Sequence, residues 1–131
     1  MYFSYSFEKL EVYKLARKFR IEIKKLTLNF PKNERFELIS QIRRSSSSIA
    51  TNLAEGSGRA SLKDQAHFTN ISFASALETI DHLSYALDMS YIENEQYEQL
   101  RNNLDIIIKK LNALYKYQIN SSKDLKSRVR N

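Results

Sequence analysis

The stretch EGSGRAS at residues 55–61 contains both glycines of this 131-residue chain, and NFPKNE at residues 29–34 contains its only proline. Sandwiches, barrels and Rossmann folds need turn residues at every corner, so three such residues in two places favour a few long helices instead. A further break falls at SYIEN, residues 90–94, which interrupts the helical pattern and offers Asn94 as an N-cap. Four segments of similar length with short connections indicate an antiparallel up-down four-helix bundle.

We therefore predict an all-α domain at about residues 1–118, followed by a basic, flexible C-terminal tail at about residues 119–131. The predicted helices cover about residues 8–29, 34–55, 62–89 and 94–118. Ser61 and Asp64 have the spacing of a capping box at the start of the third helix. Gly56 stands where a helix end favours a residue with positive φ, and Gly58 suits the tight turn that follows.

Apolar side chains recur at steps of three and four, which places them on one face of each predicted helix. In the first, second and fourth helices these positions are Val12, Ala16, Phe19, Ile23, Leu26, Phe30, Ile39, Ile42, Ser46, Ile49, Leu53, Leu100, Leu104, Ile107, Leu111 and Leu114. The third helix carries two stripes, one at Phe73, Ala76 or Leu77, Ile80, Leu83 and Leu87, the other at Phe68, Ile71, Ser75, Glu78, His82 and Tyr85. A helix that is apolar on two sides needs more neighbouring helices than one bundle provides. The run Ile106–Ile108 of the predicted fourth helix also needs such additional neighbours. We therefore expect a homo-oligomer.

The composition excludes several classes of protein. The chain has no cysteine, which excludes disulfide scaffolds, thiolate zinc sites and cysteine nucleophiles. No uninterrupted apolar run approaches about 18 residues, and the first residues lack a positively charged leader before an apolar run. We expect a cytoplasmic protein that makes no membrane contact.

The net charge of +6 is unevenly distributed along the chain. Residues 1–31 carry seven Lys and Arg against three Asp and Glu, residues 61–93 carry one against five, and residues 119–131 carry four against one. The candidate nucleic-acid-binding residues are Lys14, Arg17, Lys18, Lys24 and Lys25 on the outer face of the first helix, with Arg43, Arg59 and Lys63. Such a basic face is either a footprint for phosphates or a solvated surface that keeps the protein soluble.

Catalytic and metal-binding arrangements are incomplete in this sequence. Asp64 and His67 have the i, i+3 spacing of a di-iron bundle, but such a site needs two pairs of this kind and two further carboxylates. The loop at residues 56–61 lacks the Lys-Ser/Thr ending of a phosphate-binding loop and follows a helix instead of a strand. Glu78 and His82 can touch at i, i+4, which favours a polar pair within a helix interface. We expect no enzymatic activity, no metal and no cofactor.

Several motifs together resemble one known family. They are Gln41-Ile42-Arg43-Arg44, Ser48-Ile49, Asn52-Leu53-Ala54-Glu55-Gly56-x-Gly58-Arg59, Phe7 to Tyr13, the turn from Phe30 to Leu38, Phe68, Ser75-x-x-Glu78 and Tyr91-Ile92. Over about residues 7–118 the chain resembles the four-helix-bundle proteins encoded in intervening sequences of bacterial 23S ribosomal RNA genes. The resemblance implies a pentamer around a central channel and no known catalytic activity. The family is similar to the accessory protein of diversity-generating retroelements, a basic pentamer linked to nucleic acid and a reverse transcriptase. Serine at Ser46 and Ser47 departs from the more usual Ala or Val.

Polar residues of the central motif lie on or beside the apolar stripes. They are Gln41, Arg44, Asn52, Glu55, Arg59 and Glu78. We predict a structural network that ties the second helix to the third, with Arg59 paired to Glu55 or Glu78; a ligand site is the alternative. The leading functional hypothesis is a non-enzymatic oligomer that binds structured RNA or other nucleic acid through basic faces. The alternative is a scaffold or adaptor whose partner is another protein.

Overall fold

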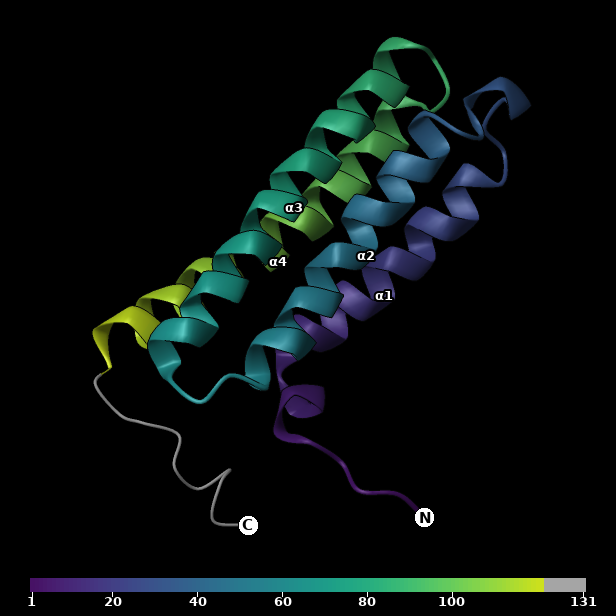
Figure 1. Ribbon diagram of the computed structural model, residues 1–131. Coiled ribbons are helices and arrows are strands. Elements are labelled where there is room, and N and C mark those ends of the chain that lie inside the picture. The colour runs from purple at the N-terminus through teal and green to yellow at the C-terminus, as the bar shows by residue number, and fades with distance from the viewer. Residues whose placement is uncertain (122–131) are drawn as a thin grey trace.

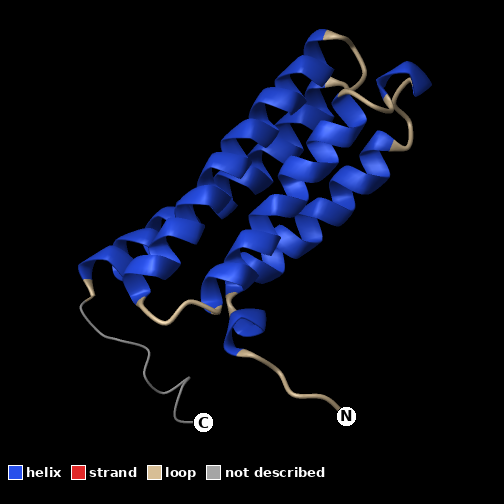
Figure 2. Ribbon diagram, viewed as in Figure 1, coloured by secondary structure: helices blue, strands red, loops and turns tan. Residues whose placement is uncertain are grey.

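The computed structural model describes residues 1–121, and within them it contains helices and no strand. The four long helices are α1 (Glu11–Thr27), α2 (Leu38–Ser57), α3 (Leu62–Asp88) and α4 (Asn94–Asn120), and the short 3-10 helices are η1 (Ser6–Lys9) and η2 (Lys32–Glu34). The long helices run alternately up and down, with short connections (Figure 1). Figure 2 shows the same arrangement by type of element. The prediction of an all-α chain with four helices is confirmed.

The helix bounds differ from the predicted ones where the chain turns. The first segment divides at Leu10, whose extended backbone separates η1 from α1, and the second begins at residue 38 because η2 precedes it. The fourth helix continues to Asn120, so the start of the predicted tail is helical. The rest of that tail, residues 122–131, lies outside the described residues.

Gly58 lies in the turn after α2, as predicted, but Gly56 does not have the role predicted for it. Gly56 lies inside α2, the helix is capped by Gly58 with φ of −79°, and no glycine has a positive φ. A Cβ at position 56 would lie 2.7 Å from the Cβ of Phe68 on α3. Glycine is therefore required here because two helices approach closely, and not because the backbone needs a left-handed conformation.

The left-handed residue occurs instead at the end of α3. Ser90 has φ of 61°, the only positive value at a non-glycine residue within the described chain. Its N–H donates to the Leu87 carbonyl at 3.0 Å, and the Tyr91 N–H donates to the Ala86 carbonyl at 2.9 Å. These two bonds form a Schellman motif, which ends α3 sharply without a glycine.

The caps confirm one prediction and correct another. Ser61 Oγ accepts a hydrogen bond from the Asp64 N–H at 3.1 Å, as the capping-box spacing predicts. Asn94 is the first residue of α4 and not its N-cap. Glu93 is the N-cap, and it forms a capping box with Gln96, whose Oε1 accepts from the Glu93 N–H at 2.9 Å.

The predicted core positions of α1, α2 and α4 are buried, except that Leu26 and Leu114 are half-buried. In α3 the two predicted stripes are only partly correct. Its buried face consists mostly of small and hydroxyl-bearing residues: Ala66, Thr69, Ser72, Ser75, Ala76, Thr79 and Ala86, with Leu62 and Leu83. Most of its larger apolar residues flank this face. Small side chains let helix backbones approach, and α2 and α3 form the most extensive of the four neighbouring helix pairs, whereas α1 and α4 form the least extensive.

Candidate nucleic-acid interface

A groove between α1 and α2 gathers positive side chains. Arg20, Lys24 and Lys25 of α1 and Arg43 of α2 line it, together with Ile21 and Ser47, around a volume of about 440 Å³. We call it the basic groove. Within residues 1–121 no carboxylate forms an ion pair with any of its four cations. The groove therefore presents uncompensated positive charge, which attracts anions.

Arg43 is held in the groove by a buried threonine. Thr27, 1% exposed at the end of α1, donates its hydroxyl to the carbonyls of Ile23 and Lys24 at 2.9 and 3.0 Å. The same oxygen accepts from Arg43 Nε at 2.8 Å. Because the bond uses Nε, the terminal nitrogens of the guanidinium remain for another acceptor, and five fixed donors make Arg suited to bidentate phosphate contacts.

The other predicted cations lie apart from this groove. Lys14 and Arg17 are exposed on α1, and Lys18 lines a narrower groove between α1 and α4. Arg59 and Lys63 lie at the far end of α2, where the chain turns into α3. Sequence reasoning missed Arg20, although its i, i+4 relation to Lys24 places both side chains on one side of the helix.

A second groove on the other side of α2 has the opposite charge. Its acidic residues are Glu34, Glu37, Asp81 and Asp88, and Leu38, Gln41, His82, Ser84 and Tyr85 complete it around about 330 Å³. We call it the acidic groove. The carboxylate of Glu34 accepts from the Tyr91 hydroxyl at 2.8 Å, and this hydrogen bond raises the pKa of Tyr91 to about 12. Two grooves of opposite sign thus flank α2, and the positive one lies on the α1 side.

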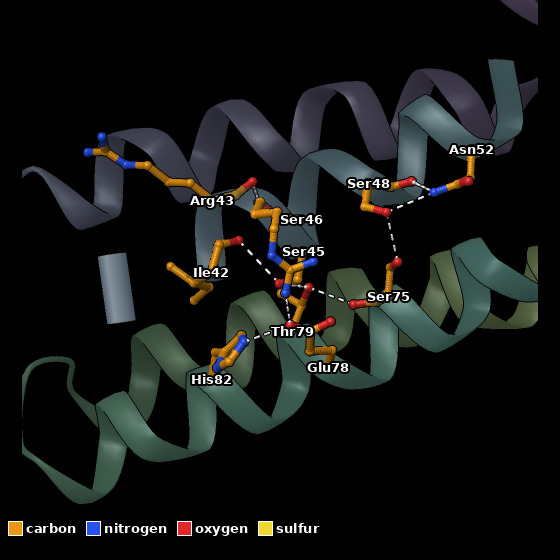
Figure 3. A network of polar contacts seen from close by, with 11 residues as sticks. Ile42, Arg43, Ser45, Ser46, Ser48, Asn52, Ser75, Glu78, Thr79 and His82 are labelled. Carbon is orange, nitrogen blue, oxygen red and sulfur yellow. Dashed lines mark hydrogen bonds and ion pairs between the residues drawn. The ribbon is translucent and has the colours of Figure 1, made fainter. Parts of the chain in front are cut away.

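Polar side chains join α2 to α3 (Figure 3). Arg44 pairs with Glu78, whose Oε2 also lies 3.1 Å from His82 Nε2. Further along, Ser45 and Thr79 share a hydrogen bond of 2.8 Å. Ser75 Oγ donates to Ser48 Oγ at 2.9 Å, and Asn52 Nδ2 donates to the same oxygen at 2.8 Å. We call these eight residues the polar cluster.

The polar cluster contains three of the predicted network residues, namely Arg44, Asn52 and Glu78. Gln41 lines the acidic groove, and Glu55 is exposed. The pairing predicted for Arg59 is wrong, because its guanidinium lies over the ring of Phe68, 4.5 Å from the centroid, and not beside Glu55 or Glu78.

The serine run supplies two members of the polar cluster, Ser45 and Ser48, that sequence reasoning missed. Ser45 and Ser48 bond to Thr79 and Ser75 on α3. The available signal is a set of hydroxyl residues at helical spacing on two neighbouring helices. Every buried side-chain nitrogen or oxygen among the described residues has a hydrogen-bond partner, so the cluster is internally satisfied.

No group of three His, Cys, Asp or Glu side chains between residues 1 and 121 is placed to hold a metal ion, and Asp64 and His67 acquire no third partner of this kind. None of the described helices combines the length and apolar character needed to cross a membrane.

Comparison with known proteins places this geometry in a family. A crystal structure of a protein of unknown function from the S23 ribosomal protein family of Bacteroides thetaiotaomicron VPI-5482 is similar, with a TM-score of 0.72 and 30% sequence identity over 80% of this chain and 98% of that chain. No curated protein matches the sequence. Residues 8–113 match the family described as 23S rRNA-intervening sequence protein, so residues 1–7 precede the match. The chain therefore belongs to the family of 23S rRNA-intervening sequence proteins.

Proposed function

We propose that this protein is a cytoplasmic, non-enzymatic protein that binds structured RNA or other nucleic acid through the basic groove. The supporting observation is that four cations line one groove of about 440 Å³ while no described carboxylate pairs with them. Each phosphate that a Lys or Arg neutralises releases a counterion, and this release drives binding at low salt.

The chemistry of the groove favours phosphates over base edges. Apart from its four cations it exposes Ile21 and the small Ser47, and it has no Asn or Gln side chain, the residues that pair with adenine. Contacts of Lys and Arg to phosphates position a nucleic acid without selecting its sequence. Lys14 and Arg17 extend the positive surface along α1. Binding therefore depends on charge and shape, with weak sequence preference.

Self-association is part of this proposal. Leu77, Tyr85 and Ile106 are 47%, 46% and 50% exposed on α3 and α4, where a second copy of the chain would cover them. The resemblance implies a ring of five subunits, and a ring would repeat the basic groove around its circumference. A mass in solution equal to that of one 15.4 kDa chain at micromolar concentration would contradict self-association.

Titration of labelled RNA and DNA at several salt concentrations tests the binding function. The groove variant is Lys24→Gln with Lys25→Gln, and the control is Lys32→Gln with Lys109→Gln, which removes two exposed lysines outside the groove. We expect the groove variant to bind more weakly and its slope of log K against log salt to fall by up to about 2. Absence of binding at low salt, binding without a salt slope, or equal effects of both variants would contradict the proposal.

The alternative function is a scaffold or adaptor that binds another protein. The acidic groove favours it, because four carboxylates there surround the half-exposed ring of Tyr85 in a volume of about 330 Å³. Aromatic residues are enriched at protein interfaces. A protein partner whose binding is lost in the variant Glu37→Gln with Asp81→Gln, combined with no nucleic-acid binding, would favour this alternative.

A further inference from the structure

Residues 1–7 form an aromatic arm that leaves the bundle beside the start of α1. Tyr2, Phe3 and Tyr5 are 89%, 66% and 60% exposed, whereas Phe7 is half-buried. The arm leaves at the end of the bundle where α2 turns into α3 (Figure 1). Three uncovered aromatic rings in four residues are a large apolar surface for a soluble protein to leave in water.

Two side-chain contacts hold the base of the arm, whereas the rings farther out are exposed. Phe7 packs edge-on against Tyr13 of α1 with 4.9 Å between the ring centroids, and Ser4 Oγ donates to Glu8 Oε2 at 3.1 Å. Phe3 and Tyr5 lie beside each other, with centroids 4.9 Å apart and planes inclined by 50°. The arm therefore carries a pair of neighbouring rings with faces open to a ligand.

The surroundings of the arm carry charges of both signs, with a small excess of positive ones. The antiparallel order of the helices brings to this end of the bundle the start of α1, the turn between α2 and α3, and the end of α4. Exposed cations there are Lys9, Lys14, Arg59, Lys63 and Lys116, and the acidic residues are Glu8, Glu11, Glu55 and Asp64. Glu11 is engaged by Lys110 at 3.4 Å. The acidic groove lies at the opposite end, near η2 and the end of α3.

We propose that the aromatic arm is a stacking platform for unpaired bases of a nucleic-acid strand. The inference rests on the proposed function and narrows its substrate to single-stranded segments. Aromatic faces stack on any base, and a positive surface alongside them follows the phosphates. Between the arm and the basic groove runs α1, whose thirteen steps from Glu11 to Lys24 span about 20 Å. Lys14 and Arg17 lie exposed along that path.

The composition of the arm suits unpaired bases. Its exposed apolar groups are mainly aromatic rings, interrupted by serines, with no Leu, Ile or Val between residues 1 and 7. Aromatic rings also occur at protein interfaces, but rings followed along α1 by the exposed cations Lys14 and Arg17 suit bases that are joined by phosphates. Bases inside a duplex are already stacked on one another, so the arm adds affinity only for unpaired ones.

The test compares binding of labelled oligouridylate and of a blunt RNA duplex of equal length by the full chain. The variant Tyr2→Ala with Phe3→Ala and Tyr5→Ala is set against Phe36→Ala, which removes an 86% exposed ring at the other end of the bundle. We expect the arm variant to bind oligouridylate at least about tenfold more weakly. Its salt slope should stay unchanged because no charge is removed. Duplex binding and the Phe36→Ala protein should also be unchanged.

A second variant keeps the rings. Tyr2→Phe with Tyr5→Phe should bind oligouridylate like the unaltered chain, because Phe stacks as Tyr does. The inference is overturned if the alanine variant binds oligouridylate normally or loses duplex binding to the same extent. It is also overturned if the alanine variant changes its mass in solution, because the arm would then form a contact between copies of the chain. If the unaltered chain binds neither nucleic acid, the proposed function fails as well, so the two failures are distinguishable.

Discussion

The substitution Gly56→Ala tests why α2 and α3 approach so closely. The new Cβ would lie 2.7 Å from the Cβ of Phe68, whereas carbon atoms pack best at about 3.5–4.0 Å. The Phe68 Cβ, which the new Cβ would overlap, is bonded directly to the backbone, so the two helices must separate by about 1 Å. Overpacking of this kind costs about 1–3 kcal/mol, while the better helix propensity of alanine returns up to about 1 kcal/mol. With the full return, we expect a net loss of up to about 2 kcal/mol in the free energy of unfolding.

Urea unfolding at a fixed protein concentration measures this loss, since the stability of an oligomer depends on concentration. The control is Gly58→Ala. Gly58 has φ of −79°, and a Cβ there would meet only the Glu55 carbonyl, at 3.3 Å. We expect the control to change stability by less than about 0.5 kcal/mol. Stabilisation by Gly56→Ala would refute the reasoning, because helix propensity and steric overlap act with opposite sign at this position.

Further predictions concern the end of α3, the polar cluster and the hydrogen bond between Tyr91 and Glu34. Ser90→Gly should raise the thermal unfolding temperature through a gain of about 1 kcal/mol, because glycine adopts the φ of 61° without a Cβ clash; an unchanged temperature would contradict this. Thr79→Val, which removes a fully buried hydroxyl, should cost about 1 kcal/mol or more. Glu78→Ala should cost less than about 1 kcal/mol, because the Glu78 side chain is 36% exposed. A larger loss for Glu78→Ala than for Thr79→Val in urea unfolding would contradict this ranking. Glu34 raises the pKa of Tyr91 from 10.0 to about 12, so the folded state holds the phenol proton more tightly than the unfolded state. The free energy of unfolding should therefore fall between pH 10 and pH 12. The variant Tyr91→Phe should lack this fall when unfolding is measured at alkaline pH.

The fold was predictable because helical periodicity is a local property. Stripes such as Ile39 to Leu53 repeat within one segment, and burial follows from that repeat whatever the neighbours are. The role of Gly56 was not predictable, because a helix end and a close helix contact both favour glycine. Only the position of Phe68 on the next helix distinguishes them.

The orientation of α3 depended on its partner. Its large residues form two stripes in the sequence, but α2 presents Ser45, Ser46 and Ala50, and small residues there select small residues opposite. Side-chain pairing across helices was likewise beyond the sequence. Arg59 contacts the ring of Phe68 because of how the turn at residues 58–61 is shaped, and the sequence contains no direct signal for that shape.

The candidate site was partly predictable for the same reasons. Helical spacing placed Lys24 and Lys25 on the outside of α1, but it did not show that Arg43 of α2, which donates a hydrogen bond to Thr27, lines the same groove. Charge counts along the chain also showed basic and acidic segments. They did not show that two grooves of opposite sign lie on either side of α2.

Protection of individual lysines from acetylation tests the central claim most directly. The full chain is acetylated with and without oligouridylate at low salt, and the modification of each lysine is measured by mass spectrometry. The account predicts that nucleic acid protects Lys24 and Lys25 in the basic groove and leaves Lys32 and Lys109 unprotected. Equal acetylation of Lys24 and Lys25 with and without bound nucleic acid would contradict it.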